Sequence, residues 1–327
     1  MHLFRKYLFS LLASFVGGTI LLASFNLAMD PFNVFGTNWT GEYIGAEREY
    51  KNDFVRRFPH DALLLGNSKV GYVDPQQLNG NCRFFNAAFP GAFAEEIYYF
   101  LERGLSDERL VVMGLDLEMF NEAMTPLVPK EEFFRSARLG ILDNLLGWTV
   151  AKASARSLSN WLSGKPPLYR RNGSSDATEA YETDRRMSAA ADDPRTINRQ
   201  LPVIEQRLFK SFSYSKARVD YIKKIKDLLD SKRVAAIVFI NPLSEHMQRM
   251  YDRLGLNKEM DRLRSDLSQI FPAFHDLTKG QYLSPRLYFN FDPIHYKPEI
   301  GATFINEMLR QNAAAGSGSM ADVCRQR

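Results

Sequence analysis

The sequence predicts an α/β protein with a three-layer parallel sheet, preceded by one membrane-spanning helix. Short apolar runs end in Gly, Asn or Asp, as strands buried on both faces do. Amphipathic helical patterns alternate with these runs, which is typical of βαβ units. Near the N-terminus, an uncharged apolar stretch is long enough to cross a bilayer.

The N-terminal apolar stretch comes first in the chain. Residues 7–29 contain no Asp, Glu, Lys or Arg, and at 1.5 Å per residue they reach about 34 Å, enough for the roughly 30 Å hydrocarbon core. Arg5 and Lys6 precede the stretch and Asp30 follows it, so the positive-inside rule predicts a cytoplasmic N-terminus. We predict a single-pass anchor over 1–30 and an extracytoplasmic main domain, periplasmic in a Gram-negative cell. A cleaved signal peptide is the competing interpretation, disfavoured because signal h-regions span only about 7–15 residues.

The strands and helices of the main domain follow a connecting region over 31–60. Apolar runs predict five strands, at 62–66, 83–86, 110–116, 234–241 and 273–277. Apolar positions three and four apart predict amphipathic helices at 95–103, 216–230, 245–254, 257–270 and 298–310. The main domain is therefore expected over 61–312, with a polar tail over 313–327.

An insertion over about 121–210 interrupts this alternation. It begins with a helical pattern and then turns polar through 163–200, with Gly-Ser and Pro-Pro breakers. The polar part offers few apolar groups to offset the entropy of ordering, which favours a mobile segment, although substrate lids and partner-binding loops share this composition.

Charge and cysteine content exclude several classes of function. The 42 basic and 38 acidic residues give a net charge of +4, spread along the chain, so nucleic acid is not an expected partner. Cys82 and Cys324 have neither a metal spacing nor the pattern of a disulfide framework, and we expect Cys82 to be a small buried residue. The five histidines are scattered and no Gly-rich phosphate loop is present, so neither a metal nor a cofactor is expected.

Ser68 and the pair Asp292 and His295 are the candidate catalytic residues. Ser68 follows the first strand in LLLGNSKV, and ligands gather beyond the carboxyl ends of parallel strands. Asp292 and His295 stand three apart in FNFDPIHYKP, and a carboxylate beside a histidine holds the tautomer that takes a proton from a serine hydroxyl. The plainer interpretation makes Ser68 a helix cap, Asp292 a turn cap and His295 a backbone-bonded side chain.

These motifs, in this chain order, resemble those of the SGNH (GDSL-like) hydrolase superfamily, whose fold is flavodoxin-like. The resemblance implies a triad of Ser68, His295 and Asp292. The segment FFNAAFPGAFAEE is similar to the second block of the family, in which an Asn-containing strand end leads to a glycine. This similarity implies an oxyanion hole made by the backbone N–H groups of Ser68 and Gly91.

The chain departs from the family pattern at two positions. Asn67 replaces the usual aspartate of the first block, and in VVMGLDLEMF Gly114 matches the third block but Asp116 stands where the family has an oxyanion-hole asparagine. An ionised carboxylate facing an oxyanion opposes catalysis, so we expect Asp116 to be protonated, turned to a substrate hydroxyl, or structural. Asn67, Asn86 and Asp116 are retained as possible substrate contacts.

The layout of the chain resembles that of cell-envelope and exopolysaccharide O-acyltransfer proteins within this superfamily. Those proteins act beside a membrane-bound O-acyltransferase, so the resemblance implies such a partner and the transfer or hydrolysis of acyl groups on a polysaccharide or glycan. The alternative is a non-catalytic polysaccharide-binding or assembly accessory protein with a degenerate fold, for which Asp116 is the best support. A paired-carboxylate glycosidase using Asp116 and Glu118 lacks a second acidic block. Asn241 is expected in an ordinary Asn-Pro turn, rather than in the same cleft.

Overall fold

The computed structural model divides the chain into two compact units. The first, the helical unit, comprises Met1–Arg57 and Glu131–Arg170, and the second, the sheet unit, comprises Phe58–Lys130 and Arg171–Arg327. The structure describes residues 2–43, 47–79, 82–125, 130–133, 140–164, 166–188 and 195–314.

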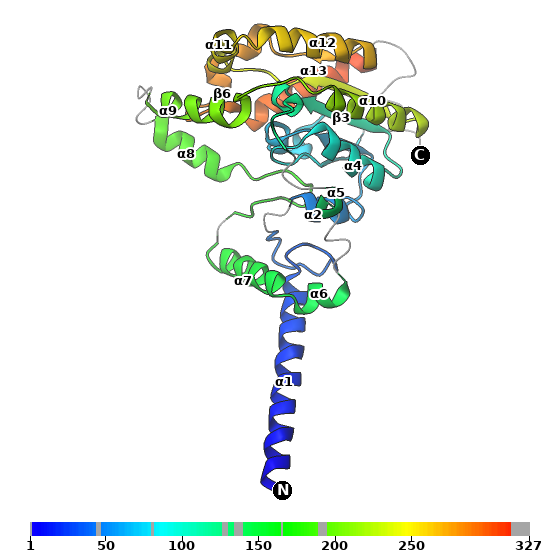
Figure 1. Cartoon of the computed structure of the whole chain (residues 1–327), viewed down its shortest axis with the longest axis vertical. Helices are drawn as coiled ribbons and strands as arrows, with labels where there is room; N and C mark the ends of the chain where they lie inside the picture. Colours follow the sequence, from blue (N-terminus) through cyan, green and yellow to red (C-terminus); the bar gives the residue numbers. More distant parts are fainter. Residues whose placement is uncertain are drawn as a thin grey trace. The chain divides into compact units, whose positions relative to one another are not determined.

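The helical unit is built on α1 (His2–Met29), which is long and apolar enough to cross a membrane. Near its C-terminal end, α1 packs against the two short helices α6 and α7, which also contact each other (Figure 1). The buried Asn26 side chain of α1 donates from Nδ2 to the carbonyl oxygen of Leu145, at 2.8 Å. The further helices of this unit are α2 (Glu47–Phe54), α6 (Ile141–Leu146) and α7 (Trp148–Leu162), while α5 (Lys130–Phe133) lies at the division between the units.

The sheet unit contains a five-stranded parallel sheet in the order β2-β1-β3-β4-β5. This is the flavodoxin-like order, in which the chain leaves β1 in one direction for β2 and crosses back for β3, and ligands bind beside that switch point. The central strands are continuous apolar runs because both faces of the sheet are covered. The strands are β1 (Ala62–Leu65), β2 (Phe84–Asn86), β3 (Leu110–Leu115), β4 (Ala235–Ile240) and β5 (His275–Asp276).

Helices cover both faces of this sheet. On one face, Leu64, Val112 and Phe239 form a buried cluster with Phe304 and Met308 of α13. On the other face, α4 packs against α10, which also contacts β4 and α12. The helices of the sheet unit with the most residues are α4 (Ala94–Gly104), α8 (Thr178–Ser188), α9 (Arg195–Ile204), α10 (Lys216–Ser231), α11 (Glu245–Leu254), α12 (Asn257–Ile270) and α13 (Pro298–Ala314).

A two-stranded antiparallel sheet holds the segment that contains the DxxH motif. It pairs β6 (Tyr288–Phe289) with β7 (Asp292–Tyr296). Tyr288 and Tyr296 lie opposite each other in this pairing, and both are buried in the cluster that includes α13. The short helix α3 (Ser68–Gly71), which follows β1, contacts β7. Packing of these aromatic rings therefore brings the end of the chain against the end of its first strand.

The structure confirms the α/β class and the five predicted strands, with β5 shortened to two residues. The predicted helices are also present, with ends that differ by at most a few residues. The predicted polar tail over 313–327 lies outside the described residues from 315 onward.

The predicted insertion over 121–210 contains elements that the sequence did not predict. Within and just after its polar part, α8 contacts β6 and α9 contacts β7, and this packing supplies order that the composition of the stretch does not predict. Glu131–Arg170 belongs to the helical unit, and the chain from Arg171 belongs to the sheet unit.

Cys82 also differs from its prediction. It is half-buried and disulfide-bonded, rather than a buried free thiol. The sequence did not predict this bond because two cysteines do not give the spacing pattern of a disulfide framework. The other cysteine of the chain, Cys324, lies outside the described residues. A disulfide suits an exported compartment, where thiols are not kept reduced.

Candidate active site

The turn after β1 presents Ser68 at the carboxyl edge of the parallel sheet. β1 ends at Leu65, and Gly66 follows with φ of +145°, where an added Cβ would lie 2.8 Å from the carbonyl oxygen of Gly114. Only glycine fits this turn without strain. Asn67 then caps α3, since its Oδ1 accepts a hydrogen bond from the backbone N–H of Lys69 at 3.0 Å. Ser68 is the first residue of that helix.

A hydrogen-bonded chain joins Ser68, His295 and Asp292. The Oγ of Ser68 lies 2.7 Å from Nε2 of His295, and Nδ1 of His295 lies 2.6 Å from Oδ2 of Asp292. Because the carboxylate accepts at Nδ1, the proton of a neutral imidazole resides there and Nε2 is left to accept the serine proton. The three residues that the sequence singled out as candidate catalytic residues are thus in direct contact, across 227 positions of sequence between Ser68 and His295.

Asp292 is held as a carboxylate in this chain. Burial acts to raise its pKa, but the neighbouring His295 and the backbone N–H groups of Ile294 and His295 outweigh burial, and the pKa lies below the ordinary aspartate value. Oδ1 of Asp292 accepts from those two N–H groups at 2.8 and 3.2 Å. One oxygen therefore fixes the β7 backbone while the other orients the imidazole.

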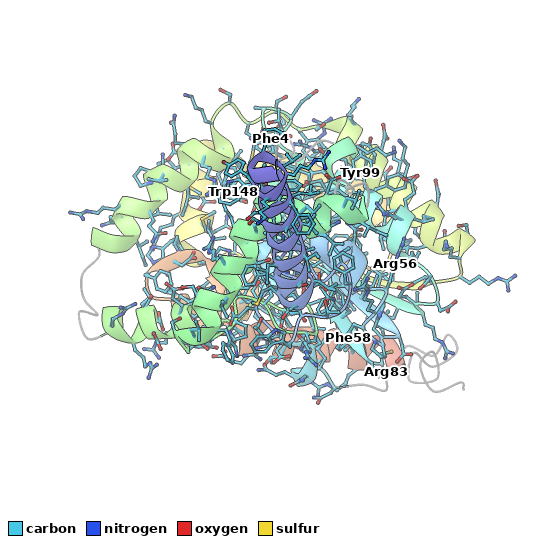
Figure 2. The ribbon with its side chains drawn as sticks, turned by 90° about the horizontal axis from the view of Figure 1, so that it is seen from below. Phe4, Arg56, Phe58, Arg83, Tyr99 and Trp148 are labelled. Atoms are coloured by element: carbon cyan, nitrogen blue, oxygen red, sulfur yellow. The ribbon has the colours of Figure 1, made fainter. Side chains whose placement is uncertain are left out.

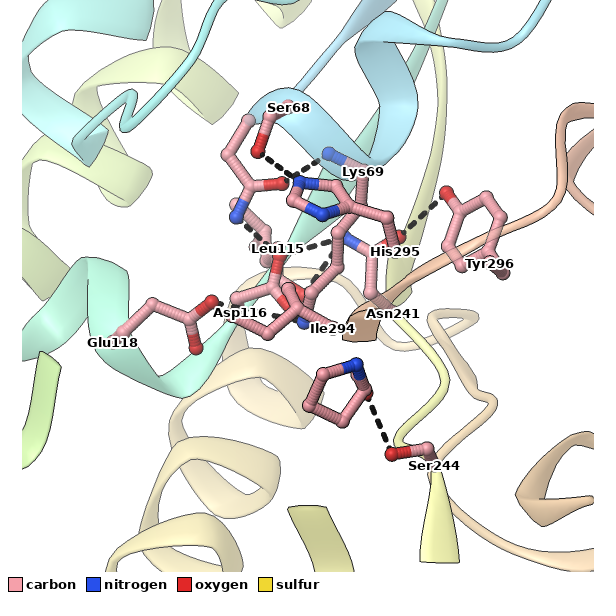
Figure 3. A network of polar contacts seen from close by, with 12 residues as sticks. Ser68, Lys69, Leu115, Asp116, Glu118, Asn241, Ser244, Ile294, His295 and Tyr296 are labelled. Atoms are coloured by element: carbon pink, nitrogen blue, oxygen red, sulfur yellow. Dashed lines mark hydrogen bonds and ion pairs between the residues drawn. The ribbon is translucent and has the colours of Figure 1, made fainter. Parts of the chain in front are cut away.

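Residues just after β4 and α3 hold the β7 segment in place. The Ser244 hydroxyl donates to the carbonyl oxygen of Pro293 at 2.6 Å, and the Tyr296 hydroxyl donates to Oδ1 of Asn241 at 3.0 Å (Figure 3). The ring of Tyr72 meets the His295 ring edge-on, with centroids 5.7 Å apart. Two of these contacts hold residues of β7 on either side of the Ile294–His295 pair, and the third is made by the imidazole ring itself.

The carboxylate of Asp116 is buried, ion-paired and hydrogen-bonded. It is 2% exposed and forms a buried ion pair with Nζ of Lys69. Its Oδ2 also accepts from Nδ2 of Asn67 at 2.7 Å and from Nδ2 of Asn241 at 2.8 Å (Figure 3). Burial acts to lower the pKa of Lys69, but the charges of Asp116 and Glu118 raise it above the ordinary lysine value. The structural option among the three expectations for Asp116 fits this geometry best.

Glu118 is the second carboxylate beside Lys69. It lies on the 3-10 turn η2 (Leu117–Phe120), and its Oε1 is 3.6 Å from Nζ of Lys69. Burial, aided by the nearby charge of Asp116, raises the pKa of Glu118 to about 7. The strand spacing that suggested a carboxylate pair does not apply, because β3 ends at Leu115 and the two acids meet through Lys69 instead.

A cavity of about 590 Å³ opens beside Ser68 and His295. Gly91, with φ of +62°, borders it together with Ser68, and so do Asn67 and Glu118. The remaining wall is largely apolar, with residues from the loop before α4, from η2 and from the segment α9–η4, where η4 is the π-helical turn Glu205–Phe209. These residues include Phe93, Met119, Met124, Val203, Ile204 and Leu208.

Asn86 is placed differently from the other candidate substrate contacts. It is fully buried, and its Nδ2 donates to the carbonyl oxygens of Val70, Gly71 and Val73 at 2.9, 3.3 and 2.8 Å. Its Oδ1 accepts from the N–H of Ala88 at 3.1 Å. The side chain therefore ties the end of β2 to the C-terminal end of α3, and it supports the helix that carries Ser68.

Sequence reasoning missed Lys69 and the α9 contribution to the cavity. The signal for Lys69 was present, since a lone lysine directly after Ser68 interrupts the apolar context of LLLGNSKVGY, and charged residues are rarely fully buried without a partner. The cavity side chains Arg199, Val203 and Arg207 come from the predicted insertion over 121–210, to which no part of the site was assigned. Among the residues that the structure describes, no group of three or more His, Cys, Asp or Glu side chains is arranged to hold a metal ion.

The pKa of Glu118 predicts a pH dependence of folding stability. A carboxyl whose pKa rises from 4.5 to about 7 on folding binds its proton more tightly in the folded chain, so this contribution is full below pH 4.5 and is lost as the pH approaches 7. Between about pH 5 and about pH 8, the free energy of unfolding in urea should fall by about 2 kcal/mol more in the parent than in Glu118→Gln. Parallel pH profiles of the two proteins would contradict the raised pKa.

Comparison with models of known protein families gives no match for this chain, and comparison with curated proteins gives no match either.

Proposed function

We propose that the chain is a membrane-anchored, extracytoplasmic protein of the SGNH hydrolase type that transfers acyl groups on a cell-envelope or exported polysaccharide. The hydrogen-bonded chain of Ser68, His295 and Asp292 beside a cavity is the observation that carries this proposal. A nucleophile, a base within hydrogen-bond reach and a third group that orients the base are the parts that acyl transfer through serine requires.

The first half-reaction forms an acyl-enzyme. Ser68 Oγ attacks the carbonyl carbon of the acyl donor while its proton passes to Nε2 of His295, and Asp292 stabilises the imidazolium through Nδ1–H. The oxyanion of the tetrahedral intermediate accepts from the backbone N–H groups of Ser68 and Gly91, which border the same cavity. The C–O bond to the leaving group then breaks, and the leaving group takes the proton from His295. An ester on Ser68 remains.

The second half-reaction moves the acyl group to an acceptor. His295 takes the proton of an acceptor hydroxyl, whose oxygen attacks the ester carbon, and collapse of the new intermediate returns the proton to Ser68 Oγ. A glycan hydroxyl as acceptor makes the protein a transferase, and water makes it an esterase. The largely apolar wall of the cavity and the membrane anchor favour transfer, because a bound acceptor that displaces water from the site would spare the acyl-enzyme from hydrolysis.

Asp116 now gives little support to a non-catalytic accessory protein. That alternative depended on a carboxylate in place of an oxyanion-hole asparagine, but Asp116 is neutralised by Lys69 and buried away from the cavity. No cofactor is needed for the proposed chemistry. A membrane-bound O-acyltransferase that supplies the acyl donor is the proposed partner, and the N-terminus of α1 is proposed to be cytoplasmic, given Arg5 and Lys6 before the span.

Covalent labelling tests the proposal. The purified full chain in detergent is treated with a fluorophosphonate, and the adduct is located by mass spectrometry. We expect modification of Ser68 in the parent and its loss in His295→Ala, because serine is a weak nucleophile without its base. An adduct on another serine, or labelling of Ser68 that persists without His295, would contradict the proposed triad.

A further inference from the structure

The three tryptophans of the chain gather in the helical unit, and all are exposed. They are Trp39, Trp148 and Trp161, with exposed fractions of 53, 74 and 44%. Trp39 and Trp161 touch edge-to-face, with ring centroids 4.8 Å apart. Exposed tryptophan on a water-facing surface is unfavourable, whereas tryptophan is enriched at membrane interfaces, where its ring is half in apolar and half in polar surroundings.

Helices α6 and α7 add apolar and basic side chains to the same surface. Ile141 and Leu142 of α6 and Leu162 of α7 are each about 70% exposed. On α7, exposed residues at positions 148, 152, 155, 159 and 162 follow one face of the helix. That face carries Lys152, with exposed Arg156 beside it, and α7 contains no acidic residue.

The position of α6 and α7 along α1 corresponds to the boundary of a bilayer. None of the residues from Phe4 to Phe25 is buried, whereas Asn26 is fully buried and bonded to Leu145 of α6. The stretch of α1 from Phe4 to Phe25 is about 33 Å long at 1.5 Å per residue, which is close to the roughly 30 Å of a hydrocarbon core. Figure 2 looks along α1 from its N-terminal end, with Phe4 labelled on α1 and Trp148 on α7.

We propose that α6, α7 and the loop containing Trp39 form a lipid-binding collar, which lies in the headgroup layer of the membrane that α1 crosses. The collar is defined by Trp39, Ile141, Leu142, Trp148, Trp161 and Leu162, with Lys152 and Arg156 directed to anionic headgroups. The proposal rests on the membrane anchoring included in the proposed function and is independent of acyl transfer. In this proposal the collar holds the C-terminal end of α1 at the membrane surface, so that this end is not a flexible linker.

Lipid is favoured over a protein partner by the chemistry of the surface and by its continuity with α1. An interfacial helix combines an apolar stripe with tryptophan and basic residues and is attracted to anionic lipids, as α7 would be. The hydrogen bond from Asn26 to Leu145 fixes α6 to α1, and the hydrogen bond from Ser157 of α7 to the carbonyl oxygen of Glu42, at 2.9 Å, ties α7 to the loop that follows α1. The collar therefore cannot avoid the headgroup layer once α1 is inserted.

Native tryptophan fluorescence reports on the collar alone, because the chain has no other tryptophan. The full chain is reconstituted into vesicles of phosphatidylcholine and phosphatidylglycerol, in which part of the phosphatidylcholine carries bromines either near the headgroup or near the chain ends. We expect blue-shifted emission that the shallow bromines quench strongly and the deep bromines quench weakly. Aqueous iodide should quench little.

A depth control separates the collar from the anchor. In this variant the three tryptophans are changed to phenylalanine and Phe15→Trp places one tryptophan in the middle of α1, where Phe15 is exposed. The collar would be overturned if deep bromines quenched the Phe15→Trp variant while only iodide quenched the native tryptophans of the parent. A protein partner would then be the better occupant of this surface. Absence of lipid quenching in both proteins would overturn the anchor and the collar together, without bearing on the triad.

Discussion

Ser68→Ala is expected to reduce acyl transfer by about 10⁴-fold or more and to leave the fold intact. The substitution removes the atom that forms the acyl-enzyme, so no remaining group in the site can replace its chemistry. Folding should be little affected, because Asn67 rather than Ser68 caps α3, and the lost contact is one hydrogen bond to His295. Such a bond contributes about 1 kcal/mol.

Single-turnover acyl transfer from an activated ester is measured for the parent and the variant. Urea unfolding of the same preparations shows whether each protein is folded. Ser268→Ala is the matched control, because Ser268 is an exposed serine on α12 that does not line the cavity and whose hydroxyl donates to the carbonyl oxygen of Ser265 in the same helix. It should retain parental activity. If Ser68→Ala kept activity within about tenfold of the parent while remaining folded, the nucleophile would have to be another group.

The position of Ser68 could be predicted because this residue follows a short, continuous apolar strand. Parallel strands align their carboxyl ends, so a serine after β1 is presented at the edge where ligands bind. The contact of Ser68 with His295 depends in addition on β7, which sequence analysis did not predict as a strand. Its pairing with β6 and its bonds to Asn241 and Ser244 are long-range contacts that leave no periodic signal.

The division into two units was beyond sequence reasoning for a similar reason. The helical unit combines one part of the predicted insertion, Glu131–Arg170, with the N-terminal Met1–Arg57, and the contact of Asn26 with Leu145 spans 119 positions. Local patterns predicted helices on each side but not their association. The order of α8 and α9 likewise comes from contacts with β6 and β7 rather than from their own composition.

The buried ion pair between Lys69 and Asp116 is a contact that the order of residues in the sequence could not predict. Sequence reasoning identified Asp116 as a problem for catalysis, because the charge that compensates it lies 47 positions earlier, on Lys69. A buried carboxylate is costly unless it is paired and hydrogen-bonded, and Asp116 has both kinds of partner. Lys69 follows Ser68 directly, so the pair also fixes the helix that presents the nucleophile.

Lys69→Met is expected to destabilise the sheet unit by about 3–5 kcal/mol, the largest effect on stability that we predict. Methionine fills a similar volume, but it leaves the carboxylate of Asp116 buried without a cation. The double variant Lys69→Met/Asp116→Asn removes both charges and should recover most of this loss, because a buried pair is often replaceable as a unit although neither partner can be lost alone. Lys223→Met, at an exposed pair with Asp220, is the matched control and should leave stability almost unchanged.

Urea unfolding of the full chain in mild detergent measures these differences, at a pH below 7, where Glu118 is largely protonated. Under that condition Asp116 is the carboxylate that depends most on Lys69, and the coupling between the two substitutions isolates their interaction. If Lys69→Met and the double variant lost equal stability, packing of the lysine side chain rather than its charge would account for the effect. Recovery in the double variant would instead identify the charge of Lys69 as the group that compensates the buried carboxylate of Asp116.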